Sequence, residues 1–332
     1  MKKALIIGVS GQDGAYLAKL LLEKGYEVHG TSRDAELSSF SRLKHLGIFS
    51  RVGRHSMSPT DFRSVMQTIL EIEPNEIYNL AGQTSVGLSF AQPVDTTESI
   101  STGTLNILEV IRFHKLPARY YNASSSECFG DTAYTAADEL TPFQPRSPYA
   151  VAKASAFWFT SVYRKAYNLF AASGILFNHE SPLRSPRFVT KKIINTACRI
   201  HAGEDVPLRL GDLSVRRDWG WAPEYVESMY RILQHDTPED FVIATGKECS
   251  LLDFVEKTFS FLGLDYRDHV EFEKNFIRPY DIPFSLGRAE KAERILGWKA
   301  KTRIDDIIAA MIKWEMERLQ DSSRGIENFN TM

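Results

Sequence analysis

ALIIGVSGQDGAYLAKLLLEK, residues 4–24, joins an apolar run to a helical pattern through a turn rich in glycine. The part up to Gly8 is continuously apolar, as expected of a parallel strand that is covered on both faces. The part from residue 15 onward carries leucines at helical spacing, and a glycine follows it as a helix stop. Between them, Gly8, Gly11 and Gly14 permit a tight turn, a close approach to the backbone and close packing of helix against strand.

The same alternation continues through the first half of the chain. Strands are expected at residues 27–30, 76–81 and 118–123, and helices at 61–72 and 103–114. Alternating strands and helices predict a Rossmann-type, doubly wound parallel sheet in an α/β protein.

The pattern changes after about residue 176, where short strands and helices mix and residues 211–221 are polar and aromatic. We expect a second, smaller and mostly C-terminal α/β domain that covers the carboxyl ends of the strands, where ligands bind in such folds. The expected division is a Rossmann domain at 1–176 with a return of the chain near 214–245, a substrate domain at 177–213 and 246–320, and a polar tail at 321–332.

Composition excludes several classes of protein. The chain has 332 residues, of which 43% are hydrophobic and 25% charged, with a formal net charge of −2. These values exclude a disordered chain and argue against a nucleic-acid or membrane-surface partner. No apolar stretch approaches the ~18 residues of a membrane span, and the N-terminus is typical of a first strand rather than of a signal peptide. Three widely spaced cysteines predict neither disulfides nor a metal site, so we expect a cytoplasmic enzyme.

The glycine-rich turn predicts a bound dinucleotide. Its position between strand and helix offers the helix N-terminus, with Gln12 and Asp13, to a pyrophosphate. The end of the second strand distinguishes the two nicotinamide cofactors, because an acidic residue there binds the ribose of NAD and an arginine can pair with the 2′-phosphate of NADP. Arg33 favours NADP, and the adjacent Asp34 keeps NAD open as the less favoured alternative.

A possible catalytic group follows the fourth expected strand, at residues 118–123. Tyr149 and Lys153 are four residues apart on a helix that starts with proline, so both side chains share one face. A tyrosine of pKa ~10 is a poor base at neutral pH, and a nearby ammonium with a cationic nicotinamide would lower that pKa. Upstream, the segment SSSE ends a strand with Glu127, a second candidate acid or base.

With these motifs in place, the chain resembles the GDP-mannose 4,6-dehydratase family of the extended short-chain dehydrogenases/reductases. The matching stretches are GVSGQDGAYLAKLLLEKGYEVHG, EIYNLAGQTSVGLSF, SSSECFG, TPFQPRSPYAVAK, GILFNHESPLR, RRDWGWAPEYVESMY and EDFVIATG.

The resemblance implies a redox-neutral conversion of GDP-mannose to GDP-4-keto-6-deoxymannose, with hydride moving from C4 to C6 through NADP. Tyr149 would take the proton of the C4 hydroxyl, and Lys153 would bond the nicotinamide ribose and lower the pKa of the tyrosine. Glu127 would remove the C5 proton as water leaves C6. Ser125 stands where the family usually has threonine, and its hydroxyl can still bond the C4 oxygen.

Further contacts are implied by the same resemblance. The cofactor would also touch Leu80, Ala81, Gln83, His179 and Arg184. The nucleotide sugar would touch Ser85, Ser126, Asn178, Lys192, Arg217, Arg278 and Asp281. The chain departs from the family at Met57 and Ser58, where an adenine-binding Asp is usual, and at Asp281, where glutamate is usual. A histidine such as His179 would also suit a hydrogen-bonded core position.

Several alternatives stay open. A GDP-manno-heptose 4,6-dehydratase would need the same catalytic residues, whereas Glu127 disfavours a 4-keto reductase or a 4-epimerase. A non-catalytic nucleotide sensor is disfavoured because Tyr149 and Lys153 are both present. Members of the superfamily commonly form a homodimer or homotetramer through two helices, here 103–114 and 150–165. The loop at 34–47 is a candidate for contact with the cofactor of a neighbouring subunit.

Overall fold

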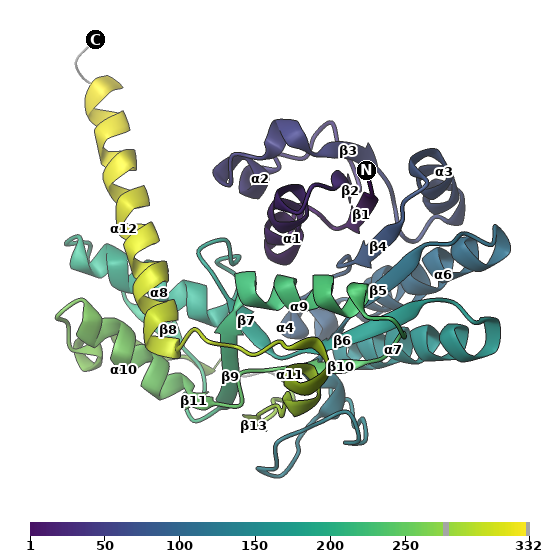
Figure 1. Cartoon of the computed structure of the whole chain (residues 1–332). Helices are drawn as coiled ribbons and strands as arrows, with labels where there is room; N and C mark the ends of the chain where they lie inside the picture. Colours follow the sequence, from purple (N-terminus) through teal and green to yellow (C-terminus); the bar gives the residue numbers. More distant parts are fainter. Residues whose placement is uncertain (275–278, 330–332) are drawn as a thin grey trace.

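Seven parallel strands form the central sheet, in the order β10-β6-β5-β4-β1-β2-β3 (Figure 1). The structure is a computed structural model and describes residues 1–274 and 279–329, with side chains up to residue 320. The strands are β1 (Lys3–Ile7), β2 (Glu27–Ser32), β3 (Gly53–Ser56), β4 (Glu76–Asn79), β5 (Arg119–Ser125), β6 (Ala171–Leu176) and β10 (Phe241–Ile243). This architecture confirms the predicted doubly wound α/β fold.

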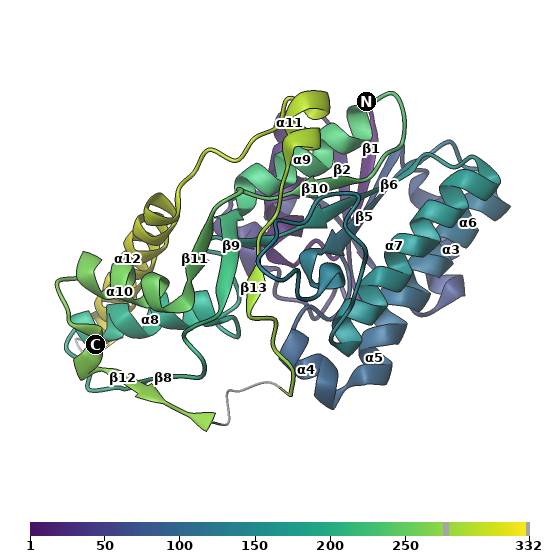
Figure 2. The same cartoon turned by 90° about the horizontal axis from the view of Figure 1, so that it is seen from below.

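Helices cover both faces of this sheet (Figure 2). One face carries α1 (Gln12–Glu23), α2 (Ser41–His45), α9 (Ala222–Gln234) and α11 (Glu290–Leu296). The other carries α3 (Phe62–Ile72), α6 (Gly103–Phe113) and α7 (Pro148–Tyr167), with α4 (Val86–Ala91) and α5 (Pro93–Thr97) beside α7. Each face has its own apolar core, because strands buried on both sides need apolar side chains in both directions.

A second lobe follows β6. Its main sheet has the order β11-β9-β13, with β7 paired to β9. The strands of this lobe are β7 (Asn178–Glu180), β8 (Leu208–Leu210), β9 (Arg216–Trp221), β11 (Glu248–Ser250), β12 (Val270–Phe272) and β13 (Phe284–Ser285). Three helices, α8 (Val189–His201), α10 (Leu251–Phe261) and α12 (Ile304–Phe329), pack into an apolar core with them.

The chain returns from the second lobe to the first sheet through α9 and β10. Within the expected return at 214–245, residues 216–221 form β9 of the second sheet, and residues 222–243 join the first lobe. Asp218 of β9 is fully buried, and its carboxylate accepts the backbone N–H groups of Thr245 and Gly246, both at 2.9 Å. Burial raises its pKa to about 6 despite these donors. The carboxylate therefore ties the two sheets together where the chain crosses between them.

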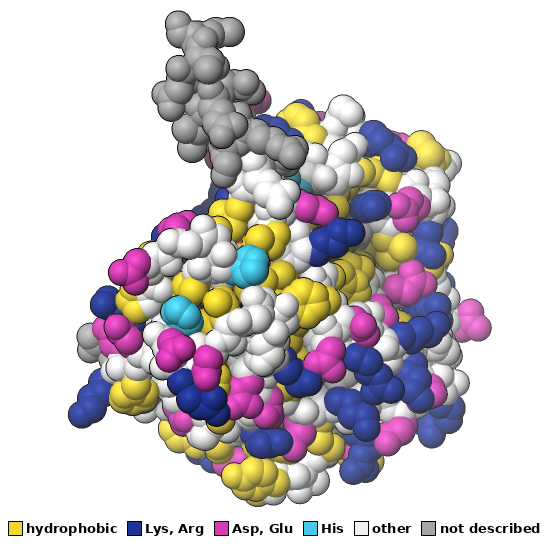
Figure 3. Space-filling view, turned by 90° about the vertical axis from the view of Figure 1, so that its left-hand side faces the viewer, with side chains coloured by type: hydrophobic (Ala, Val, Ile, Leu, Met, Phe, Trp, Pro, Cys, Tyr) yellow, Lys and Arg dark blue, Asp and Glu magenta, His cyan; other side chains and the backbone are white. Residues whose placement is uncertain are grey.

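The surface that Figure 3 shows mixes Lys and Arg side chains with Asp and Glu side chains. Among the described residues, no helix combines the length and apolar character needed to cross a bilayer.

Candidate active site

A cavity of about 600 Å³ opens at the carboxyl ends of the first sheet and extends between the two lobes. The sequence-predicted residues that line it are Asp13, Leu80, Ser85, Ser125, Ser126, Glu127, Tyr149, Lys153, Asn178, His179, Arg184, Lys192, Arg217 and Asp281. Seven further predicted residues lie outside this lining, namely Gly8, Gly11, Gln12, Gly14, Arg33, Ala81 and Gln83. Arg278 falls outside the described residues.

The glycine-rich turn has the geometry that its sequence predicts. Gly8 has φ of +91°, and a Cβ on it would lie 3.1 Å from the backbone of Ala81. A Cβ on Gly14 would lie 2.5 Å from the carbonyl oxygen of Gly8, so side chains are excluded there. Gly11 is the N-cap of α1 and offers no side chain to the first-turn amides. Uncapped amides at a helix N-terminus fit an anionic diphosphate.

Asp34 and Arg33, the two charged residues after β2, differ in their contacts. Asp34 Oδ1 accepts the backbone N–H groups of Glu36 and Leu37, both at 2.9 Å. Its carboxylate is therefore engaged in the turn that follows the strand. Arg33 is exposed, and no ion pair links it to a carboxylate among the described residues. Near the end of β3, Ser58 Oγ lies 3.0 Å from Thr60 Oγ1.

The catalytic candidates come from two neighbouring elements. β5 ends at Ser125, and the 3₁₀ turn Ser126–Phe129 follows directly, which brings Glu127 to the cavity wall. α7 begins after Ser147, whose Oγ accepts the N–H of Ala150 at 3.1 Å. One turn of this helix places Tyr149 and Lys153 on one face, where both are buried and line the cavity.

Burial dominates the electrostatics of this group. It raises the pKa of Tyr149, which a hydrogen bond to the side chain of Ser125 partly opposes. Burial also lowers the pKa of Lys153 to about 8. The ammonium donates to the carbonyl oxygen of Ala123 at 2.8 Å, and its Nζ lies 5.8 Å from the centre of the tyrosine ring. The expected lowering of the tyrosine pKa is therefore not a property of the protein alone, and positive charge in the cleft must supply it.

His179 joins the two lobes. Its Nδ1 lies 2.7 Å from the carbonyl oxygen of Phe177, and its Nε2 lies 2.9 Å from Oδ2 of Asp13. Both ring nitrogens are thus engaged within the protein, as in a hydrogen-bonded core histidine, although the ring lines the cavity. Gln12 reinforces the contact, because its Nε2 donates to the carbonyl oxygen of His179 at 3.2 Å and its Oε1 accepts from Ser181 at 2.7 Å.

Sequence reasoning missed Glu180, which is 1% exposed and lines the cavity. Its Oε2 accepts from Oγ1 of Thr190 at 2.7 Å and lies 3.2 Å from Nε of Arg184. The guanidinium of Arg184 also lies 3.6 Å from the centre of the Phe188 ring. The carboxylate of Glu180 therefore helps to hold the guanidinium of Arg184 in its position. Its position between His179 and Ser181 in the motif NHESP is the sequence signal that could have identified it.

The far end of the cavity carries cations. Arg217 is buried, and its Nη2 donates to Oδ1 of Asp281 at 2.9 Å. Lys192 Nζ donates to the carbonyl oxygen of Arg209 at 2.6 Å. The lining also includes three charged residues that the sequence did not suggest, namely Arg187, Arg209 and Asp212. Arg209 lies in β8, whereas Arg187 and Asp212 lie in loops, and the fold brings all three to the site.

The side chain of Gln83, expected to touch the cofactor, makes hydrogen bonds within the protein. Its Nε2 donates to the carbonyl oxygen of Ser85 at 2.8 Å and to Oγ1 of Thr96 at 3.2 Å. Ser85 in turn caps α4, because its Oγ accepts the N–H of Leu88 at 3.2 Å. Gln83 thus shapes the turn that brings Ser85 and Val86 to the cavity.

Residues 5–311 match the profile of the GDP-mannose 4,6 dehydratase family. The chain belongs to the GDP-mannose 4,6-dehydratase family. Two relatives illustrate how far the similarity extends. GDP-mannose 4,6 dehydratase 1 of Arabidopsis thaliana is 41% identical over 326 residues, which cover 95% of this chain and 90% of the relative. GDP-mannose 4,6-dehydratase of Sinorhizobium fredii is 40% identical, with 96% and 98% covered. Membership in this dehydratase family confirms the resemblance predicted from the motifs.

Solved structures support the fold. A dTDP-glucose 4,6-dehydratase of Bacillus anthracis in complex with NAD superimposes with a TM-score of 0.83 at 19% identity, covering 96% of this chain and 97% of that chain. The RMD protein of Pseudomonas aeruginosa in complex with NADPH gives a TM-score of 0.79 at 20% identity, covering 96% and 100%. At this level of identity the likeness establishes the shared two-lobed fold.

Proposed function

We propose that the protein is a hydro-lyase that converts GDP-mannose to GDP-4-keto-6-deoxymannose. The observation that carries this proposal is the presence of two potential proton-transfer groups, Tyr149 and Glu127, on the wall of one cavity. A reductase or 4-epimerase of this fold needs one such group at the reacting carbon, whereas elimination of water needs a second. Membership in the dehydratase family agrees with this assignment.

The proposed cofactor is NADP. Gly8, Gly14 and the uncapped first turn of α1 would hold its diphosphate. Arg33 would pair with the 2′-phosphate, and this choice is supported by Asp34, whose carboxylate is engaged by two backbone amides. When bound, the nicotinamide would accept a hydride from C4 of the sugar and return it to C6 (overall redox-neutral).

Tyr149 would take the proton of the C4 hydroxyl. The pKa of its phenol is raised in the protein alone, so the base form needs nearby positive charge. Lys153 is buried beside it and can hold such charge, and the oxidised nicotinamide would add more. Ser125, whose side chain acts to lower the pKa of the tyrosine, would bond the C4 oxygen and align it.

Glu127 would complete the elimination. A ketone at C4 acidifies the C5 proton, which the Glu127 carboxylate would remove as the C6 hydroxyl departs. The carboxyl group would then give that proton to the leaving hydroxyl, so that one water forms and Glu127 ends the step unchanged. As hydride reaches C6, C5 would take up the proton that Tyr149 removed from the C4 hydroxyl, and both residues would return to their starting forms. Glu127 is partly buried in the first half of the 3₁₀ turn that follows β5, two positions after Ser125 in the chain.

The cations at the far end of the cavity would hold the nucleotide. Lys192 and Arg217 carry charge that suits the diphosphate or the guanosine ribose, and Asn178 offers an amide at the start of β7. Asp281, which stands where the family usually has glutamate, fixes the guanidinium of Arg217. Its carboxylate would therefore act on the substrate through that arginine.

We propose that two copies associate through α6 and α7. Val151, Trp158 and Val162 lie on one side of α7 at helical spacing, and each is more than half exposed. Exposed large apolar side chains in a row on one helix are typical of a protein interface.

The decisive experiment incubates the purified protein with GDP-mannose, without added reductant, and follows the mass of the nucleotide sugar. Loss of one water supports the proposal. If GDP-mannose stays unchanged in a preparation shown to contain bound nicotinamide cofactor, the proposal that GDP-mannose is the substrate is wrong. GDP-manno-heptoses and then other nucleotide sugars would be tested next.

A further inference from the structure

Two histidines face each other on the last two strands of the first sheet, outside the lining of the cavity. Nδ1 of His29, in β2, lies 3.0 Å from Nε2 of His55, in β3. His29 is in register with Gly53, and His55 comes two positions later, so both side chains stand on the same face of the sheet. Because β3 is the final strand in the sheet order, the pair lies at a sheet edge.

A carboxylate sets the position of the proton on His29. Nε2 of this ring lies 2.8 Å from Oε1 of Glu27, and a carboxylate can accept only, so Nε2 carries the proton. In the neutral ring, Nδ1 then holds a lone pair that is directed toward His55. Histidines that bind metal ions almost always donate their other ring N–H in this way, to a carboxylate or a carbonyl.

The sheet edge leaves room beside this lone pair. A Cβ on Gly53 would lie 2.7 Å from Nδ1 of His29, so any other residue there would cover that nitrogen. Both histidines are partly exposed. Burial and the neighbouring His29 lower the pKa of His55, although Glu71 opposes this, so the His55 ring is neutral at neutral pH. Two neutral imidazoles are therefore available as ligands.

The separation of the two nitrogens favours one coordination geometry. Imidazole nitrogens bind divalent transition metals at about 2.0–2.1 Å, so an ion bound to two nitrogens 3.0 Å apart would see them at roughly 90°. That is the angle between neighbouring ligands in the tetragonal sites of Cu²⁺ and Ni²⁺, and it is smaller than the angle in a tetrahedral zinc site. The χ2 torsion of histidine is broad, so both rings can turn their lone pairs toward one ion.

We propose that His29 and His55 form a binding site for a divalent transition-metal ion of tetragonal geometry, with Cu²⁺ bound more tightly than Ni²⁺ or Zn²⁺. Nδ1 of His29 and Nε2 of His55 are its protein ligands, and Glu27 orients the first of these rings. The proton of His55 moves from Nε2 to Nδ1, so the neutral pair binds the ion without net loss of a proton. Among the described residues, no group of three or more His, Cys, Asp or Glu side chains could hold a metal ion, so water completes the coordination.

A bound ion would cross-link the edge strand β3 to β2. An ion that binds the folded chain more tightly than the unfolded chain raises the free energy of unfolding by mass action. The pair does not line the cavity, so this inference does not rest on the proposed function.

The test titrates Cu²⁺ into the untagged full-length protein, freed of metal by a chelator, and follows binding by calorimetry and by electron paramagnetic resonance. We expect one Cu²⁺ per chain at this site, a spectrum with two coordinated imidazole nitrogens, and a higher melting temperature. His55→Asn should weaken binding at least about tenfold and leave one imidazole nitrogen in the spectrum. Glu27→Gln keeps both ligands and should weaken binding by about 10- to 100-fold, as for loss of a partner that orients a ligand.

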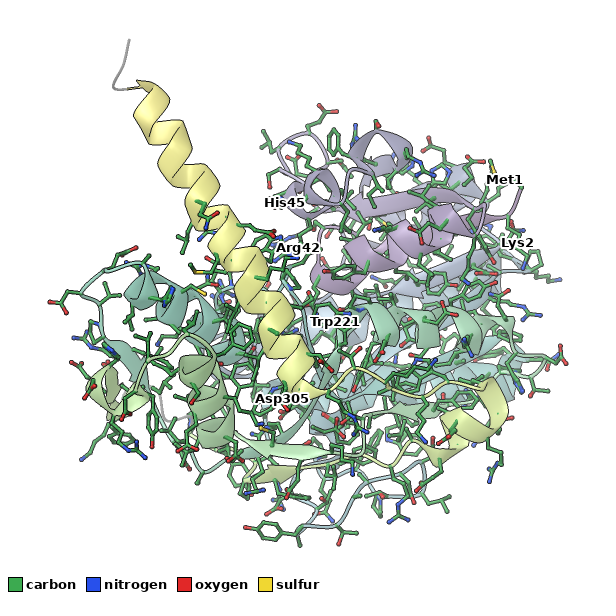
Figure 4. The ribbon with its side chains drawn as sticks, turned by 60° about the vertical axis from the view of Figure 1, so that its left-hand side comes forward. Met1, Lys2, Arg42, His45, Trp221 and Asp305 are labelled. Atoms are coloured by element: carbon green, nitrogen blue, oxygen red, sulfur yellow. The ribbon has the colours of Figure 1, made fainter. Side chains whose placement is uncertain are left out.

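His45→Asn is the matched control. His45 is an exposed histidine of α2 in the same lobe, and Figure 4 shows it beside α12. Its ring contacts the ring of Trp314, with centres 5.9 Å apart. The affinity for Cu²⁺ and the spectrum of this variant should equal those of the unaltered protein.

Three results would overturn the assignment. Equal Cu²⁺ affinity of His55→Asn and the unaltered protein would place any bound ion elsewhere. A spectrum of the unaltered protein with a single imidazole nitrogen would exclude joint binding by the two rings, which would then serve only as a hydrogen bond between β2 and β3. Tighter binding of Zn²⁺ than of Cu²⁺ would exclude the tetragonal geometry.

Discussion

Oδ2 of Asp13 lies 2.9 Å from Nε2 of His179, so a hydrogen bond, which is also an ion pair when His179 is protonated, joins the first helix of the sheet to the first strand of the second lobe. The two residues are 166 positions apart in the chain. Burial raises the pKa of Asp13, but the charge and hydrogen bond of His179 outweigh it and the pKa falls to about 2. Burial likewise lowers the pKa of His179, and Asp13 outweighs it, so that pKa is raised above 6.5.

A pH window of stability follows from these two shifts. The carboxylate contributes stability above its usual pKa of 3.8 and loses it as the pH falls toward 2. The imidazolium contributes below 6.5 and loses its contribution as the pH rises through its raised pKa. The nearby Arg184 opposes protonation of His179 and limits its shift. The pair should therefore stabilise the fold most between about pH 4 and 6.5, by about 2 kcal/mol.

Urea unfolding of the protein and of Asp13→Asn across this range measures the effect. The difference in unfolding free energy should be largest in the window and shrink on both sides. A difference that does not change with pH would mean that hydrogen bonding, rather than charge, holds the two lobes at this point.

Glu127→Gln should separate the two halves of the reaction. A carboxamide cannot remove the C5 proton, whereas Tyr149 and Ser125 remain to support oxidation at C4. We expect reduced cofactor to accumulate, seen by its absorbance, while no dehydrated sugar forms. Glu98→Gln, at an exposed position outside the cavity lining, serves as the matched control. Normal turnover by Glu127→Gln would remove this residue from the mechanism.

Tyr149→Phe should lower kcat by about 10²- to 10⁴-fold with little change in KM, because a general base is lost and substrate contacts are kept. Ser125→Ala should have a smaller effect, since it removes one hydrogen bond to the tyrosine and leaves the base. Steady-state kinetics on both variants, with the retained cofactor quantified, make the comparison. Equal losses in the two variants would contradict the distinct roles assigned here.

Lys153→Met should make the protein more stable and less active. The pKa of the buried ammonium is lowered by burial from 10.5 to about 8, so its charge opposes folding at neutral pH. Removal of the charge should raise the unfolding free energy by about 2 kcal/mol, after the lost hydrogen bond to Ala123 is counted. In the unaltered protein, stability should rise with pH between about 8 and 10.5, because the unfolded state then binds more protons. A destabilised Lys153→Met would show that the hydrogen bond outweighs the burial of charge.

Asp281→Asn should raise KM for the nucleotide sugar about tenfold and leave kcat nearly unchanged. The substitution weakens the ion pair that fixes Arg217, at the end of the cavity away from Tyr149 and Glu127. Asp281→Glu restores the charge with one more methylene and should recover most of the affinity. Equal KM values for the unaltered enzyme and Asp281→Asn would exclude a role for this pair in binding.

Trp158→Asp should convert an associated form of the protein to monomers, because a charge replaces a half-exposed indole on the proposed α7 interface. Light scattering coupled to size exclusion measures the mass. Phe261→Asp is the control, since Phe261 is similarly exposed on α10 of the second lobe. An unchanged mass for Trp158→Asp would rule out this face of α7 as the interface.

Patterns of local sequence were sufficient for the sheet and for the chemistry of its carboxyl edge. The glycine turn, the alternation of strands and helices and the four-residue spacing of Tyr149 and Lys153 each depend on neighbouring residues in the chain. Element bounds differed by a few residues: β4 ends at Asn79 rather than at residue 81, because the chain turns there against Gly8.

Tertiary structure decided what each polar side chain does. His179 stands in a motif that left its role open, and its partner Asp13 lies 166 positions away in the chain. Glu180 contacts Arg184, four residues further on in the loop after β7, and Thr190 in α8, and no periodic pattern marks either contact. Periodicity records which face of a helix or strand is buried, and so it determined the fold. A hydrogen bond or ion pair between segments far apart in sequence leaves no periodic trace, and depends on distances that exist once the two lobes have packed.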